Sequence, residues 1–162
     1  MGRRSFTVEE ANRMIPAVEG ALDEIEKKKV EIGRYSEKLQ ILDALWGEKV
    51  TQPKNPDHGE FRRHRDLVSA AIKDVDRLIR RRILGLGLRF PPGGLEHGLI
   101  DFPTTFEGRW VFLCWQRGED EVRFWHEIDG GYAGRQEIAA EHVIAMGREN
   151  SSEIPDDSIF DG

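Results

Sequence analysis

The sequence predicts an α+β fold made of a long antiparallel helical hairpin and a small antiparallel β-sheet. Two stretches with apolar residues at spacings of three and four lie on either side of a loop rich in proline at residues 50–59. Beyond Gly87, short runs rich in β-branched and aromatic residues replace this helical period. At 162 residues we expect a single domain over 1–147, with the helical hairpin at about 8–84 and the sheet region at about 88–138.

The first helix begins at a capping box. Glu10 follows Thr7 by three residues, so the hydroxyl and the carboxylate can each satisfy a free backbone N–H, and we expect the helix to start at Val8. Pro16 removes one backbone hydrogen bond and is expected to kink or restart the helix. Beyond it, a narrow apolar stripe continues to Trp46, as in a coiled-coil hairpin.

The second helix carries a similar stripe from Phe61 to Ile83. Three arginines at 80–82 lie in its last turn, where cations suit the helix dipole, and Gly85 is a typical residue just past a helix end. Two antiparallel helices are the simplest arrangement. They cannot surround their own stripes, so something else must cover them.

Three short runs beyond this helix have the composition of strands: LIDF (99–102), RWVFLCWQ (109–116) and EVRFWHEI (121–128). If Gly118 and Glu119 form the loop between the last two, Leu113 pairs with Phe124. Both faces of this hairpin are apolar, so we expect the helices on one face and another strand layer or a second subunit on the other. A short closing helix is expected within 138–147, and residues 148–162 are expected to form a disordered acidic tail.

Composition excludes several classes of function. The net charge of −6 and the pI near 5.4 argue against nucleic acid or an anionic membrane as the main partner. We find no run of about 20 apolar residues, so no membrane span is predicted and the expected location is cytoplasmic. Cys114 is the only cysteine, which excludes an intrachain disulfide, and its place in a strand indicates a buried structural thiol.

Polar residues at the strand ends are the candidate ligand-binding group. A metal needs histidine nitrogens and carboxylates that converge, but the chain has no HExxH pattern and no closely spaced ligand pair, so we predict no metal and no cofactor. No catalytic residue is assigned. The six candidates are His97, Asp101, Glu119, His126, Asp129 and Arg135.

The stretch FWHEIDGGYAGR at 124–135 has two interpretations. As a structural feature, it is a strand end followed by a glycine-shaped loop, which Arg135 pins to Asp129 or Glu127. As a binding site, the same glycines let the backbone approach an anion. We favour the structural interpretation.

Four motifs carry a resemblance to a known family. They are FTVEEANRMIP at 6–16, GLIDFP at 98–103, VFLCWQRGE at 111–119 and FWHEIDGGYAGR at 124–135. Together they resemble the bacterial and archaeal family named domain of unknown function 2203, from Phe6 to about Ile138. The family is uncharacterised and has no established catalytic residues. The resemblance implies that the four motifs belong to one unit.

These observations favour a non-enzymatic cytoplasmic interaction or scaffold protein. It is expected to self-associate, most simply as a two-fold homodimer, with an unidentified protein partner as a further expectation. The alternative is a small-ligand or metal-binding protein, or an enzyme, with a pocket at the sheet near His126, Asp129 and Arg135. Perturbed titratable groups lining a pocket favour the alternative, whereas a continuous apolar seam favours self-association.

Overall fold

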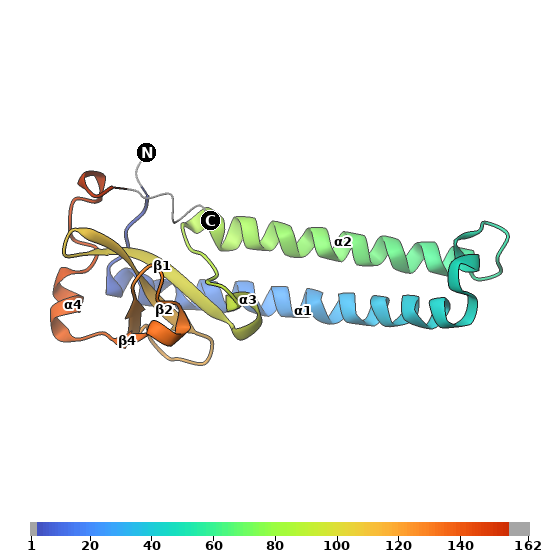
Figure 1. The fold of residues 1–162 in the computed structure, drawn as a ribbon, viewed down its shortest axis with the longest axis horizontal. Helices are drawn as coiled ribbons and strands as arrows, with labels where there is room; N and C mark the ends of the chain where they lie inside the picture. Colours follow the sequence, from blue (N-terminus) through green and yellow to red (C-terminus); the bar gives the residue numbers. More distant parts are fainter. Residues whose placement is uncertain (1–2, 156–162) are drawn as a thin grey trace. The chain divides into compact units, whose positions relative to one another are not determined.

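Helices and strands occupy separate stretches of the chain, which confirms the α+β prediction. The computed structural model describes residues 3–155 (Figure 1). The chain divides into two compact units. The hairpin unit is Gly20–Arg81, and the sheet unit combines Met1–Glu19 with Arg82–Gly162.

Two long helices form where the apolar stripes predict them. They are α1 (Val8–Trp46) and α2 (His58–Arg82). The capping box at the start of α1 is confirmed, because Thr7 N donates to Glu10 Oε1 at 2.9 Å and Glu10 N donates to Thr7 Oγ1 at 3.1 Å. Pro16 lies inside α1, which continues through it, so the helix does not restart there. No helix within residues 3–155 has an apolar stretch long enough to cross a bilayer.

The hairpin unit is held together by contacts between α1 and α2. The rings of Tyr35 and His64 meet edge to face at 6.2 Å, and Lys28 pairs with Asp74 at 3.3 Å. After α1 a 3₁₀ helix, Gly47–Thr51, leads into the connecting loop, where Trp46 Nε1 donates to Asp57 Oδ2 at 2.7 Å. Residues late in α1 contact residues early in α2, so the two helices are antiparallel, as predicted.

The sheet is an antiparallel meander in the order β1-β2-β3-β4. The first two strands are joined by a tight turn in which Glu107 and Gly108 both have positive φ, 51° and 75°. A two-residue turn of this kind matches the twist of the strands and sets their register, which pairs Asp101 with Cys114. The strands are β1 (Leu99–Phe106), β2 (Arg109–Gln116), β3 (Phe124–His126) and β4 (Gln136–Glu137).

The register between β2 and β3 differs from the predicted one by one residue. Leu113 pairs with Trp125 rather than with Phe124. The connecting loop is longer than expected because Val122 leaves the ladder and donates its N–H to Asn12 Oδ1 of α1 at 2.7 Å. Since side chains alternate along a strand, this shift places His126 on the same face as Cys114.

Both faces of β1 and β2 are buried, as predicted for β2. On one face the ring of Phe6 packs against Phe102, with 5.6 Å between ring centroids. On the other face the guanidinium of Arg89 lies 3.8 Å from the ring centroid of Phe112. A loop of the same chain therefore covers this face at Phe112, where we expected another strand layer or a second subunit.

The predicted closing helix is confirmed as α4 (Ala140–Ala145). After it the chain returns to the sheet, where Gly147 N donates to Thr105 O at 3.0 Å. Residue Glu149, in the predicted tail, accepts hydrogen bonds from Gly108 N at 3.1 and 3.2 Å. The expected disordered tail therefore makes contacts at its start, and its last part, 156–162, lies outside the described residues.

Candidate functional site

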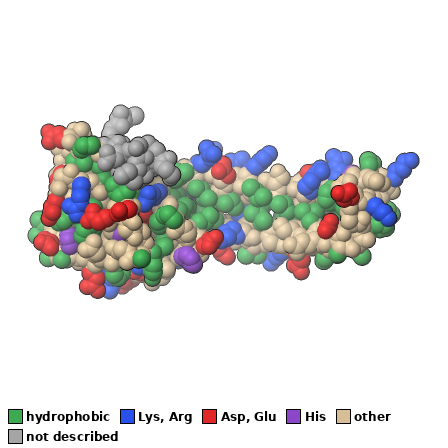
Figure 2. Space-filling view, viewed as in Figure 1, with side chains coloured by type: hydrophobic (Ala, Val, Ile, Leu, Met, Phe, Trp, Pro, Cys, Tyr) green, Lys and Arg blue, Asp and Glu red, His purple; other side chains and the backbone are tan. Residues whose placement is uncertain are grey.

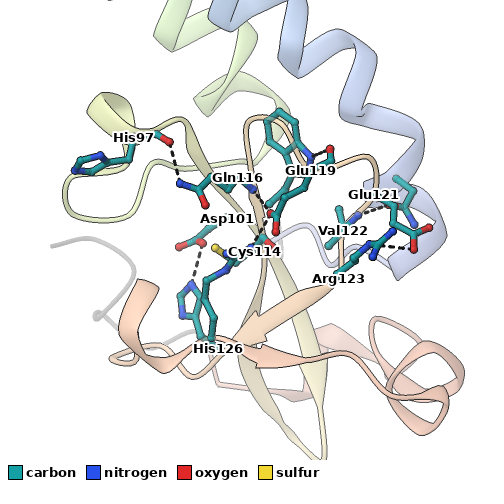
Figure 3. A network of polar contacts seen from close by, with 12 residues as sticks. His97, Asp101, Cys114, Gln116, Glu119, Glu121, Val122, Arg123 and His126 are labelled. Atoms are coloured by element: carbon teal, nitrogen blue, oxygen red, sulfur yellow. Dashed lines mark hydrogen bonds and ion pairs between the residues drawn. The ribbon is translucent and has the colours of Figure 1, made fainter.

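A buried acid–base pair lies on one face of the sheet (Figure 3). Asp101 of β1 and His126 of β3 are fully buried, with 2.9 Å between Oδ1 and Nε2. The second carboxylate oxygen accepts a hydrogen bond from Arg89 Nε at 3.1 Å. The pair forms because the β1–β2 turn and the shifted β2–β3 register place both side chains on the same face.

The hydrogen bonds of His126 show where its protons lie. Nδ1 is 2.7 Å from the backbone oxygen of Glu127, which can only accept, so Nδ1 carries a proton. Nε2 faces the carboxylate of Asp101, so a second proton lies between them. Burial lowers the pKa of His126, but the bond and charge of Asp101 and the Glu127 carbonyl together raise it above its ordinary value. Neither nitrogen is free to act as a general base in this state.

Cys114 completes the group, which we name the Asp101–Cys114–His126 cluster. Each residue offers one ligand atom, and these atoms lie within 4.8 Å of one another. Burial, reinforced by the Asp101 carboxylate, raises the pKa of Cys114 to about 12. Cys114 is therefore a neutral thiol near neutral pH and a poor nucleophile, and its predicted burial is confirmed.

A second charged pair joins the two loops beside the cluster. Arg135 Nη2 lies 2.7 Å from Glu119 Oε1 and 3.4 Å from the backbone oxygen of Cys114. The guanidinium also stacks on Phe124, 4.0 Å from the ring centroid. The predicted partners Asp129 and Glu127 are wrong, because the longer β2–β3 loop brings Glu119 within reach of Arg135.

Glu127 has a different partner. Arg109 binds it through two hydrogen bonds, at 2.6 Å from Nη2 and 2.9 Å from Nε. The bonds to Arg109 hold the pKa of Glu127 below its ordinary value. Glu127, the residue after His126, thus links the start of β2 to the end of β3 through Arg109.

His97 and Asp129 do not join either pair. His97 is exposed at the end of the short helix α3 (Gly94–His97), where it lines a surface depression with Tyr132. Asp129 is also exposed and lines another depression, beside Trp110. The structure therefore brings together four of the six candidates, as Asp101 with His126 and Glu119 with Arg135.

The four motifs of the sequence lie together in the sheet unit. A family profile described as "Uncharacterized conserved protein (DUF2203)" matches residues 4–138. The chain belongs to this family. No curated protein and no solved structure matches it. The DUF2203 match ends near β4 and covers the whole Asp101–Cys114–His126 cluster.

Two members of the site in this DUF2203 protein were not found from the sequence. Arg89 precedes the first strand in an irregular segment, and we know of no local signal that marks it as the partner of Asp101. Cys114 was recognised only as a buried thiol. The Glu107-Gly108 pair is the signal that could have placed Cys114 beside Asp101, since a two-residue hairpin turn there aligns the two positions.

Proposed function

We propose that this DUF2203 protein is a cytoplasmic, non-enzymatic interaction or scaffold protein that self-associates through its hairpin unit as a two-fold homodimer. The observation that carries the proposal is the exposure of large apolar side chains on both helices. Val30, Ile41 and Leu45 of α1 are 47%, 48% and 68% exposed, and Ile72 of α2 is 53% exposed. Figure 2 shows hydrophobic side chains in a band along the hairpin.

Val30, Ile41 and Leu45 lie outside the α1 stripe that faces α2, because a helix can cover only one side of its neighbour, so these apolar side chains stay exposed in a single hairpin. A second hairpin packed on the same surface forms a four-helix arrangement, in which the exposed side chains of both copies are buried. Full burial of a Leu or Ile side chain stabilises by about 1.5–3 kcal/mol. A two-fold axis makes the contact self-complementary and closes the assembly at two copies.

Charge favours a second copy of the chain as the occupant of this surface. The part of α1 in the hairpin unit carries six acidic and five basic residues, whereas α2 carries four acidic and eight basic residues. A two-fold arrangement that places α1 of one copy against α2 of the other brings unlike net charges together. The net charge of −6 makes nucleic acid the weaker candidate for the basic helix.

The sheet unit supports the non-enzymatic part of the proposal. Both nitrogens of His126 are engaged, the thiol of Cys114 is neutral, and Arg135 is occupied by Glu119 and an aromatic ring. A substrate therefore meets no free general base or activated nucleophile in this group. Asp129, the remaining member of the suggested pocket, lies exposed at a different place.

Sedimentation equilibrium over a micromolar concentration range tests the proposal. We expect the wild-type chain to sediment as a dimer. Leu45→Glu and Ile72→Glu place a charge in the buried seam and should each raise the dissociation constant at least about tenfold, which corresponds to about 1.4 kcal/mol. Circular dichroism checks that each variant keeps its helices.

Ile144→Glu is the matched control. Ile144 is 73% exposed but lies on α4 in the sheet unit, so the same change there should leave the dimer intact. A wild-type chain that stays monomeric at all concentrations contradicts the proposal. Equal weakening by all three substitutions contradicts the assignment of the interface to the hairpin unit.

A further inference from the structure

We propose that the Asp101–Cys114–His126 cluster is a buried binding site for a zinc-type divalent transition metal, coordinated by Asp101 Oδ1, Cys114 Sγ and His126 Nε2. The three residues come from β1, β2 and β3 and lie on one face of the sheet. All three are fully buried, and their ligand atoms lie within 4.8 Å of one another. The proposal concerns the sheet unit and does not depend on self-association.

The hydrogen-bond pattern around His126 is that of a metal ligand. The proton on Nδ1 is held by the backbone oxygen of Glu127, which directs the lone pair of Nε2 toward Asp101. Metal-bound histidines usually donate their other N–H to a carbonyl or carboxylate in this way. Two acceptors, Nε2 and a carboxylate oxygen, face each other at 2.9 Å, and such a pair must hold a proton or a cation between them.

The distances fit a tetrahedral site after a small adjustment. Zinc binds nitrogen, oxygen and sulfur ligands at about 2.0–2.3 Å, which separates the ligand atoms by about 3.3–3.8 Å. The Asp101–His126 distance of 2.9 Å therefore has to open by about half an ångström. The thiol of Cys114 has to approach from within 4.8 Å. Both adjustments call for rotations of these three side chains.

The choice of metal follows from the ligands and their charge. A thiolate with an imidazole selects zinc-type ions over magnesium or calcium, which prefer oxygen ligands. The carboxylate and the thiolate balance the two positive charges. The cation takes the place of two protons, one from Cys114 and one from between Asp101 and His126, so the charge of the buried cluster is unchanged. Arg89 keeps its bond to the second oxygen of Asp101 as an outer partner.

Burial indicates what such a metal does. Three protein ligands leave the fourth tetrahedral position to a water molecule, as in catalytic zinc sites, but all three ligand residues here are fully buried, which closes this position to substrate. The cation therefore acts as a structural link that ties β1, β2 and β3 together. Because β3 has only three residues, it gains the most from an additional connection to its neighbours.

Metal titration of the full-length chain tests the site. The protein is stripped with a chelator and titrated with zinc chloride or cobalt(II) chloride, and bound metal is measured by equilibrium dialysis. Cys114 is the only cysteine, so a thiolate-to-cobalt charge-transfer band in the near-ultraviolet reports this residue alone. We expect one equivalent of metal per chain, the cobalt band, and a higher melting temperature with zinc.

Cys114→Ser is the decisive variant because it replaces one atom and preserves the side-chain shape. It should abolish the cobalt band and weaken zinc binding at least about a hundredfold, since the loss of an outer partner alone weakens metal binding by about 10–100-fold. His97→Gln, which removes an exposed histidine outside the cluster, should change neither readout. The proposal is overturned if the wild-type chain shows no cobalt band, or if Cys114→Ser binds zinc as tightly as the wild type.

Discussion

The guanidinium of Arg135 lies 2.7 Å from the carboxylate of Glu119, and this pair joins the loop that precedes β4 to the loop that follows β2. The Arg135 side chain is only 10% exposed. Its planar group also stacks on Phe124 at 4.0 Å. One side chain thus combines a charged hydrogen bond with an aromatic contact, which an ammonium group cannot do in the same geometry.

Arg135→Lys should therefore lower the free energy of unfolding by about 1–2 kcal/mol, measured from the urea midpoint. Arg123→Lys is the matched control, because Arg123 pairs with Asp120 at 3.0 Å but is 55% exposed, and its replacement should change the stability by less than about 0.5 kcal/mol. An Arg135→Lys protein with a wild-type midpoint would show that the pair does not stabilise the sheet unit.

Gly147→Ala should destabilise the protein by at least about 2 kcal/mol in urea unfolding. Gly147 has a φ of +76°, and an added Cβ would overlap the backbone of Phe6. Gly33→Ala is the contrasting change, since Gly33 lies in α1 and the new Cβ would point into open space. It should stabilise by about 0.5–1 kcal/mol. Similar effects of the two substitutions would contradict the close approach at Gly147.

The capping carboxylate of Glu10 makes the free energy of unfolding depend on pH. The backbone N–H of Thr7 is the main cause that lowers the pKa of Glu10 from its ordinary value of 4.5, against the opposing effect of burial. Its contribution is present above the unfolded-state pKa and is lost as the pH falls through the folded-state pKa. The wild type should therefore be more stable than Glu10→Gln at pH 7, and the difference should shrink as the pH falls below about 4.5. Urea unfolding of both proteins at a series of pH values measures this difference. A difference that stays constant with pH would contradict the prediction.

Removal of residues 148–162 should change the melting temperature by less than about 2 °C. Within the described part of this segment, Arg148 and Glu149 bind the rest of the chain through exposed contacts, to Glu9 and Gly108. A cut that also removes Met146 and Gly147 should lower the melting temperature much further, because Met146 is fully buried. If both truncations lowered the melting temperature equally, residues 148–162 would have to pack against the rest of the chain, contrary to this prediction.

Local signals in the sequence were sufficient to predict the two long helices and the places of β1, β2 and β3 along the chain. The Thr7–Glu10 capping box, the two apolar stripes and the proline-rich loop each act within a few residues, and they correctly predicted α1, α2 and the antiparallel hairpin. The continuous apolar run of RWVFLCWQ likewise predicted β2 and its burial on both faces. Such features are visible in a sequence because the forces behind them are short-range.

The side-chain pairs of the site depend on register and on contacts between distant segments. Val122 leaves the ladder to bond Asn12, a residue 110 positions away, and this shifts β3 by one residue. Because neighbouring positions on a strand face opposite sides, that shift brings His126 to Asp101, and the longer loop brings Glu119 to Arg135. No local pattern specifies a one-residue shift, since it goes with a hydrogen bond between Val122 and Asn12, which are far apart in the sequence.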